Sequence, residues 1–93
     1  KGIDFTTPNG KTIDVKTARK AYNLIHEENK SFADIYVLAQ YIDNKEESIL
    51  IGWEYGHVLK KSPRKDFGYG VINHYINKNK LNSMQDLKEI CGI

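Results

Sequence analysis

Five consecutive apolar residues, Ile35 to Ala39, constrain the fold of this chain more strongly than any other part of its sequence. They lie within a segment that begins at Asp34 and is followed by the polar pair Asp43-Asn44. An apolar run without alternation is typical of a strand that is covered on both faces, as in the middle of a sheet. We therefore expect a central strand at residues 34–42.

Turn signals predict a hairpin on each side of this strand. The segment Pro8-Asn9-Gly10-Lys11 contains the Asn-Gly pair that favours a tight turn, so residues 3–7 and 11–17 should form an opening hairpin. After the central strand, the loop Asp43-Asn44-Lys45-Glu46 leads to a β-rich run at residues 48–53. We expect this run to pair antiparallel with the central strand and to place Trp53 in the core.

The remaining segments predict short elements. Glu54 to Lys61 has the pattern of a short helix that Pro63 ends, and a strand at 71–76 follows the loop Gly68-Tyr69-Gly70. A last helix should begin after Ser83, which can serve as its N-cap, and end at Gly92. Together these elements predict an α/β fold class with a mixed, mostly antiparallel sheet and few flanking helices.

The size and charge of the chain narrow the function classes only slightly. Ninety-three residues with 40% hydrophobic content suit one domain with a modest core. The net charge of +2 is too small to indicate nucleic-acid binding by itself. One local basic cluster stands out, consisting of Lys60, Lys61, Arg64 and Lys65. It is a candidate for phosphate contacts with nucleic acid, and the alternative interpretation is a solvated loop.

Cysteine and histidine usage argues against several kinds of site. The single cysteine, Cys91, excludes a disulfide framework within the chain and fits a reducing compartment such as the cytoplasm. His26, His57 and His74 form no metal-binding pattern, and we expect them at the surface or partly buried. The longest apolar run is far shorter than the about 20 residues that a membrane-spanning helix needs, so we expect no membrane partner.

The run Ile13-Asp14-Val15-Lys16-Thr17 is the candidate site. Because strand side chains alternate, Ile13 and Val15 should share one face while Asp14 and Lys16 share the other. Closing the opening hairpin would bring Asp4 near this second face. Two carboxylates beside a lysine can hold a divalent cation and position a water, which is the minimum for metal-assisted phosphodiester hydrolysis. The alternative is a simple charge pair on an exposed strand face.

This spacing resembles the PD-(D/E)XK nuclease superfamily, which includes restriction endonucleases, Holliday-junction resolvases and many phage nucleases. The signature of that superfamily is a first acid, a spacer, and then acid-x-lysine on a strand, which Asp4, Asp14 and Lys16 match. The likeness extends over most of the chain through the segments 33–38, 49–53 and 73–76.

The resemblance implies a restriction-endonuclease-like core and a Mg²⁺-dependent (or Mn²⁺-dependent) endonuclease that hydrolyses phosphodiester bonds in DNA. Asp4 and Asp14 would bind the ion, and the carbonyl of Val15 would add one more oxygen. Lys16 would orient the attacking water and stabilise the developing charge. The expected partner is DNA, with a homodimer as one arrangement, in the cytoplasm of a bacterial or phage-infected cell.

The resemblance also implies a helix with a further acid before Lys1. We therefore expect residues 1–93 to form a single nuclease-like domain that is incomplete at its N-terminus. Two other functions stay open. One is a non-catalytic nucleic-acid-binding or protein-binding domain with the same fold, and the other is a small regulator or inhibitor with an unrelated α/β fold.

The stretch from Ala18 to Asn29 fits two structures. Its apolar residues recur at helical spacing, whereas Tyr22, Leu24 and His26 alternate as in a strand. The family likeness favours a strand at about 22–27, preceded by a short irregular piece.

Overall fold

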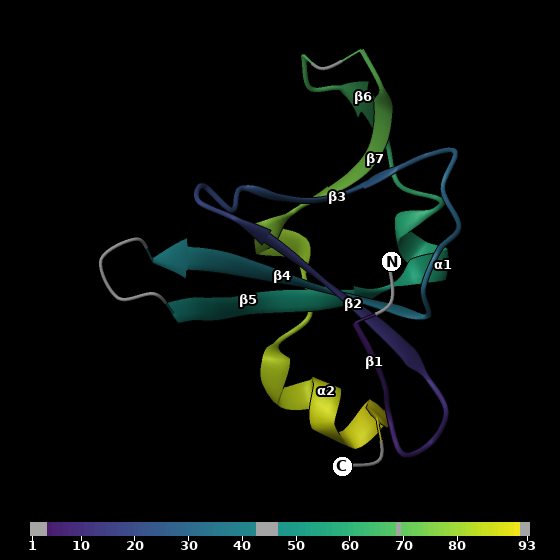
Figure 1. Cartoon of the computed structure of the whole chain (residues 1–93), viewed down its shortest axis with the longest axis vertical. Coiled ribbons are helices and arrows are strands. Elements are labelled where there is room, and N and C mark those ends of the chain that lie inside the picture. The colour runs from purple at the N-terminus through teal and green to yellow at the C-terminus, as the bar shows by residue number, and fades with distance from the viewer. Residues whose placement is uncertain (1–3, 43–46, 69, 92–93) are drawn as a thin grey trace.

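The computed structural model describes residues 4–42, 47–68 and 70–91, and it has an α/β fold (Figure 1). Its strands are divided between a mixed sheet of four and an antiparallel sheet of three. The elements are β1 (Phe5–Thr6), β2 (Thr12–Ala18), β3 (Asn23–Glu27), β4 (Ile35–Ile42), β5 (Glu47–Tyr55), α1 (Gly56–Leu59), β6 (Arg64–Asp66), β7 (Ile72–Asn77), the 3₁₀ helix η2 (Lys78–Lys80) and α2 (Met84–Cys91). The expected fold class, with a mixed and mostly antiparallel arrangement and few helices, is confirmed.

The four-stranded sheet has the order β1-β2-β4-β5, so β4 is an inner strand as its apolar run predicts. The five residues from Ile35 to Ala39 are all buried. β1 pairs antiparallel with β2, and β5 pairs antiparallel with β4, which confirms both expected hairpins. β2 and β4 run parallel, with Asp14 opposite Tyr36 and Lys16 opposite Leu38. The expected loop at 43–46 lies outside the described residues.

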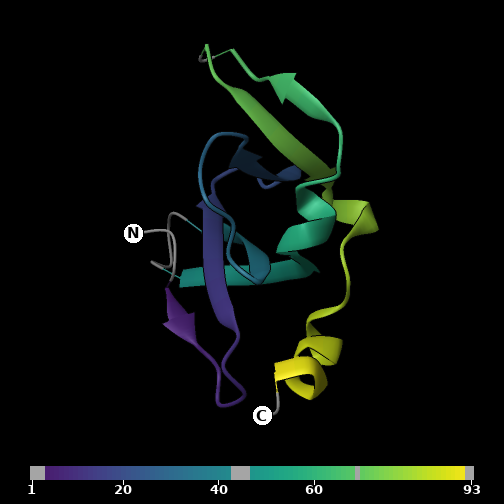
Figure 2. The same ribbon diagram turned by 90° about the vertical axis from the view of Figure 1, so that its right-hand side faces the viewer.

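The three-stranded sheet has the order β3-β7-β6. β3 pairs antiparallel with β7, so the strand expected at 22–27 is confirmed and a helix over this stretch is not formed. β6 was not expected, because Arg64-Lys65-Asp66 has no apolar alternation. Its backbone pairing with β7 defines it instead. This sheet and α2 lie on opposite sides of the four-stranded sheet (Figures 1 and 2).

Alternate residues of β4 therefore enter two separate apolar clusters. The cluster on the α2 side consists of Ile13, Ile35, Val37, Trp53, Leu87 and Cys91. The cluster on the side of the three-stranded sheet consists of Ala21, Leu24, Ala33, Tyr36, Leu38 and Leu59. Burial on both faces explains why the β4 sequence does not alternate between apolar and polar residues.

The helices differ in how well the sequence predicts them. α1 is shorter than the stretch from Glu54 to Lys61, because residues 54 and 55 still belong to β5. α2 begins as expected, and Ser83 Oγ accepts the Gln85 N–H at 3.2 Å. The expected end at Gly92 and the loop residue Tyr69 lie outside the described residues. Within the described ranges, no helix is long and apolar enough to cross a membrane.

Two glycines are required by the local backbone. Gly10 has φ of 83°, which suits the tight turn between β1 and β2, and its N–H donates to the Thr7 carbonyl at 2.9 Å. Gly56 begins α1 against the segment before β4, where a Cβ atom would come 1.9 Å from the Ala33 carbonyl oxygen. Gly56 thereby allows α1 to lie close to the beginning of β4.

Candidate functional site

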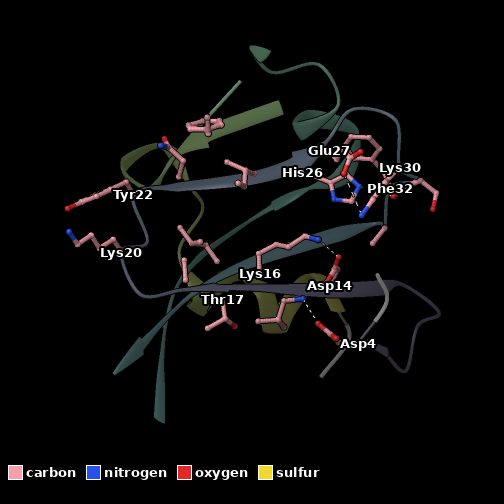
Figure 3. Close-up of a pocket in the computed structure, with 18 residues that line it drawn as sticks. Asp4, Asp14, Lys16, Thr17, Lys20, Tyr22, His26, Glu27, Lys30 and Phe32 are labelled. Atoms are coloured by element: carbon pink, nitrogen blue, oxygen red, sulfur yellow. Dashed lines mark hydrogen bonds and ion pairs between the residues drawn. The ribbon is translucent and has the colours of Figure 1, made fainter. Parts of the chain in front are cut away.

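A cleft of about 950 Å³ lies between β2 and β3, where the two sheets face each other (Figure 3). This volume is near the upper end of the roughly 300–1,000 Å³ that is typical of ligand sites. Asp4, Asp14, Val15 and Lys16 all line it. The structure thus brings the residues of the acid-x-lysine signature to one cleft.

The direction in which Asp14 and Lys16 point follows from the packing of their neighbours. Ile13 is buried in the cluster on the α2 side, and Val15 packs against the same cluster. Because strand side chains alternate, Asp14 and Lys16 must then face β3. The expected alternation, with Asp14 and Lys16 on one face of β2 and Ile13 and Val15 on the other, is confirmed.

Asp14 is a buried carboxylate. Asp14 is 4% exposed as a whole residue. Its Oδ2 lies 3.0 Å from Nζ of Lys16, and the Lys16 side chain is one-third exposed. This ion pair lacks hydrogen-bond geometry, so Oδ2 of Asp14 has no hydrogen-bond partner. Removing a carboxylate from water costs several kcal/mol, and its attraction to a neighbouring ammonium group often fails to offset this cost. The pair is therefore a poor candidate for a purely stabilising contact.

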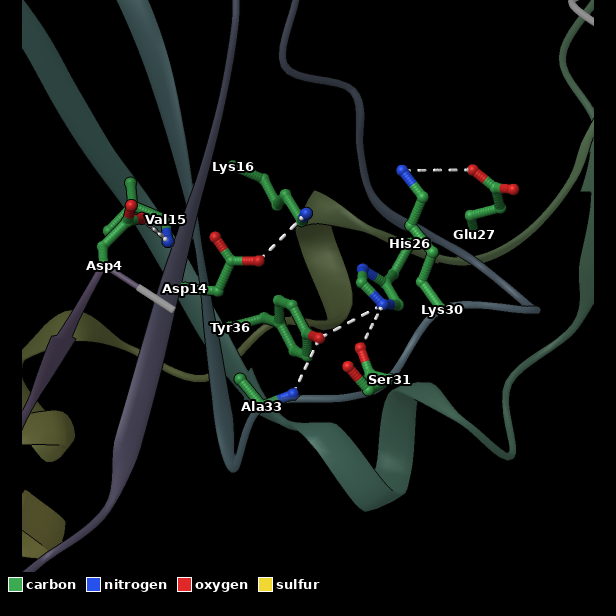
Figure 4. Close-up of polar contacts among 10 residues, drawn as sticks. All are labelled: Asp4, Asp14, Val15, Lys16, His26, Glu27, Lys30, Ser31, Ala33 and Tyr36. Carbon is green, nitrogen blue, oxygen red and sulfur yellow. Dashed lines mark hydrogen bonds and ion pairs between the residues drawn. The ribbon is translucent and has the colours of Figure 1, made fainter. Parts of the chain in front are cut away.

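Asp4 lies at the edge of β2 that faces β1. Its Oδ2 accepts the Val15 N–H at 2.6 Å, and its own N–H donates to the Ile13 carbonyl at 2.8 Å. The N–H and C=O of a strand residue point to the same edge, so the Val15 carbonyl is directed toward Asp4 as well. Asp14, by contrast, lies over the face of the strand (Figure 4). The two carboxylates line one cleft and have different partners, the Val15 N–H for Asp4 and the Lys16 ammonium for Asp14.

The donor set has the chemistry that Mg²⁺ prefers. Two carboxylates and one backbone carbonyl are hard oxygen donors, and a Mg²⁺ site commonly uses one or two carboxylates together with several waters. The buried Oδ2 of Asp14, which has an ion pair with Lys16 but no hydrogen-bond partner, fits such an ion. In the described residues, no three His, Cys, Asp or Glu side chains are grouped so that they could hold a metal ion. Shared coordination by Asp4 and Asp14 stays a prediction.

His26 is a cleft residue that the sequence did not single out. It is 5% exposed and His74 is 9% exposed, so the expectation of surface or partly buried histidines is wrong for both. The Ser31 carbonyl lies 2.9 Å from Nε2 of His26 and can only accept, which assigns the proton to this nitrogen. Burial lowers the pKa of His26, and nearby Lys16 lowers it further. The alternation of Leu24 and His26 was the signal that could have placed it inside.

Tyr36 connects His26 to the acid-lysine pair (Figure 4). Its hydroxyl accepts the Ala33 N–H at 2.9 Å and lies 3.3 Å from Nε2 of His26. Its ring lies 5.7 Å from Nζ of Lys16, which is within cation–π range. Burial raises the pKa of Tyr36, and the charge of Asp14 raises it further. Tyr36 was expected only as a core residue, because its apolar neighbours hide its polar role.

The basic cluster is distributed rather than gathered into one patch. Arg64 forms an ion pair with Glu28 at 2.8 Å, and Lys61 lines a second, smaller cleft. Lys60 lies 5.9 Å from the Phe32 ring, and Lys65 lies 5.1 Å from the Phe67 ring. Both rings line the main cleft, whose own lysines are Lys16, Lys20 and Lys30. The sequence pattern did not identify Lys20 and Lys30, because they are isolated in the chain.

Comparison with known proteins adds no relative. No protein-family model matches the chain, and neither the curated proteins nor the solved structures give a match.

Proposed function

We propose that this chain is a Mg²⁺-dependent (or Mn²⁺-dependent) endonuclease that hydrolyses phosphodiester bonds in DNA. The observation that carries the proposal is the ion pair of buried Asp14 with half-buried Lys16 in the cleft, with an Asp14 oxygen that has no hydrogen-bond partner. A strand inside a core gains little from such a pair. The likeness of Asp4, Asp14 and Lys16 to the PD-(D/E)XK signature supports the same reaction.

Each residue of the site has a role in this proposal. Asp4, Asp14 and the Val15 carbonyl would hold the ion, which when bound supplies Lewis-acid stabilisation and an activated water. The Val15 N–H fixes the Asp4 carboxylate through the 2.6 Å hydrogen bond. Lys16 would hold the attacking water and stabilise the extra negative charge on the phosphate in the transition state.

The surroundings of the site suit this chemistry. The ammonium group of a lysine carries three N–H donors, so Lys16 can donate hydrogen bonds to a phosphate oxygen. His26 is held neutral by its burial and therefore adds no competing positive charge near the cation site. The reducing cytoplasm of a bacterial or phage-infected cell is part of the proposal, and it suits the buried free thiol of Cys91. A homodimer would supply one site for each strand of a duplex.

The test is cleavage of supercoiled plasmid in Mg²⁺ by the wild-type chain and by Asp14→Asn. We expect Asp14→Asn to lower the cleavage rate about 10²–10³-fold, because it keeps the shape but removes the charge that holds the ion. DNA binding measured with Ca²⁺ in place of Mg²⁺ should change little, since phosphate contacts elsewhere supply most of the affinity. Asp86→Asn, an exposed acid on α2, is the matched control and should cut at the wild-type rate.

Near-normal cleavage by Asp14→Asn would mean that the pair is structural and that the site assignment is wrong. A wild-type chain that binds DNA but does not cut it in Mg²⁺ or Mn²⁺ would favour the non-catalytic domain with the same fold.

A further inference from the structure

The two ends of the cleft differ in chemistry. The acids that line it, Asp4, Asp14 and Glu27, lie away from the end formed by Thr17, Lys20 and Tyr22 (Figure 3). At this second end Lys20 is exposed, and Tyr22 is 59% exposed. An exposed aromatic ring beside a lysine, with no acid among the described lining residues of this end, suits an anionic ligand that carries flat rings.

Phe67 is a further aromatic side chain in the lining of the cleft. It comes from the segment directly after β6, which is a strand of the three-stranded sheet. Tyr75 holds its ring edge-on, with ring centroids 5.6 Å apart and an interplanar angle of 88°. Nζ of Lys65 lies 5.1 Å from the Phe67 ring centroid. A positioned ring with a cation next to it is the arrangement by which proteins bind unpaired bases and the adjoining phosphates.

The depth of the cleft limits what can reach its acidic end. Asp14 is only 4% exposed, so a phosphate that approaches it has to enter the cleft. A duplex carries its phosphates on the outside of a stiff rod, with a persistence length of about 150 base pairs. The bases of a duplex are also stacked on one another and cannot stack on protein rings. A single strand is flexible and presents both its phosphates and its bases.

We propose that the cleft binds an unpaired stretch of nucleic acid, with bases stacked on Tyr22 and Phe67 and the backbone directed toward Lys16. This inference rests on the proposed function for the position of the scissile phosphate, and it defines the substrate as single-stranded or locally unpaired. The contacts distinguish unpaired from paired strands and do not select between deoxyribose and ribose.

The test is fluorescence anisotropy in Ca²⁺ with a short labelled DNA single strand, an RNA of the same sequence and the matching DNA duplex. We expect tighter binding of a single strand than of the duplex. Tyr22→Ala and Phe67→Leu should each weaken single-strand binding about fivefold or more. Phe67→Leu keeps an apolar side chain against Tyr75, so the fold should persist, and thermal melting checks this. Phe5→Ala is the control, because Phe5 is 50% exposed and lies outside the lining of the cleft.

Duplex binding as tight as single-strand binding, or single-strand binding that both variants leave unchanged, would overturn the inference. If duplex DNA is still cut in Mg²⁺ in that case, the proposed nuclease function stands although the single-strand inference fails.

The opposite outcome can also be recognised. Single-strand binding that depends on both rings, without any cleavage in Mg²⁺, would support the inference and contradict the nuclease assignment. Binding of the RNA strand instead of the DNA strand would support the inference and identify the sugar.

Discussion

The two faces of the four-stranded sheet are built from alternate residues of the same strands, yet they differ in kind. On the face toward α2, the cluster around Trp53 is mostly aliphatic and aromatic, and Nε1 of Trp53 donates to the Ser83 carbonyl at 2.8 Å. On the face toward β3, the neighbouring positions hold the buried residues Asp14 and Tyr36, and buried His26 faces them from β3. The comparison indicates that one face supplies stability, while the other contains the costly polar groups of the cleft.

The largest effect should come from the apolar face. Trp53→Ala removes a side chain that is 1% exposed, lies in one cluster with Leu87 and Cys91 of α2, and donates to the Ser83 carbonyl. We expect it to lower the free energy of unfolding by about 3–5 kcal/mol, measured by urea denaturation. If Trp53→Ala lost less stability than Tyr36→Phe, the stated division between the faces would be wrong.

A smaller effect is expected from the polar face. Tyr36→Phe keeps the ring but leaves the buried Ala33 N–H without its acceptor. We expect a loss of about 1–3 kcal/mol in the same urea measurement, the cost of a buried donor without a partner. Tyr41→Phe is a matched control on the same strand, since the Tyr41 hydroxyl has no hydrogen bond among the described contacts. An unchanged free energy of unfolding for Tyr36→Phe would mean that a water molecule accepts the Ala33 N–H in place of the Tyr36 hydroxyl.

The smallest effect is a pH dependence at the same face. Burial lowers the pKa of His26 below its ordinary value of 6.5, so the unfolded chain binds more protons than the folded chain as the pH falls through this range. Stability should therefore decrease as the pH falls from 6.5 toward the folded pKa, and level off below it. His26→Gln should reduce this acid-induced fall in melting temperature, whereas His57→Gln, at an exposed position, should retain it. Equal pH responses in the two variants would contradict the assignment to His26.

Local patterns predicted most of the elements. The apolar run at Ile35 to Ala39, the Asn9-Gly10 turn and the Ser83 cap each depend on residues close in sequence, and each is present. β6 was missed because Arg64-Lys65-Asp66 is exposed and its strand structure comes from backbone pairing with the distant strand β7. The division into two sheets was missed for the same reason, since pairing between distant strands leaves no local signal.

The site was predictable only in part. Alternation correctly placed Asp14 and Lys16 on one face, because the burial of Ile13 and Val15 forces it. The cleft itself depends on how β3 lies over β2, which no periodicity encodes. His26 and the hydroxyl of Tyr36 were therefore not recognised as neighbours of the pair. Sharing of one ion by Asp4 and Asp14 remains a prediction.

The parallel register of β2 and β4 bears on the order in which the molecule assembles. Parallel neighbours cannot be joined by a tight turn, so the whole segment 19–34, including β3, must cross over before these strands can pair. Such distant pairing is slow, because the chain loses loop entropy before the contacts compensate for it. The β4–β5 hairpin has no such delay. We therefore expect the strand that carries Asp14 and Lys16 to dock late in folding, so that a chain emerging from the ribosome acquires its cleft only after β4 has been synthesised.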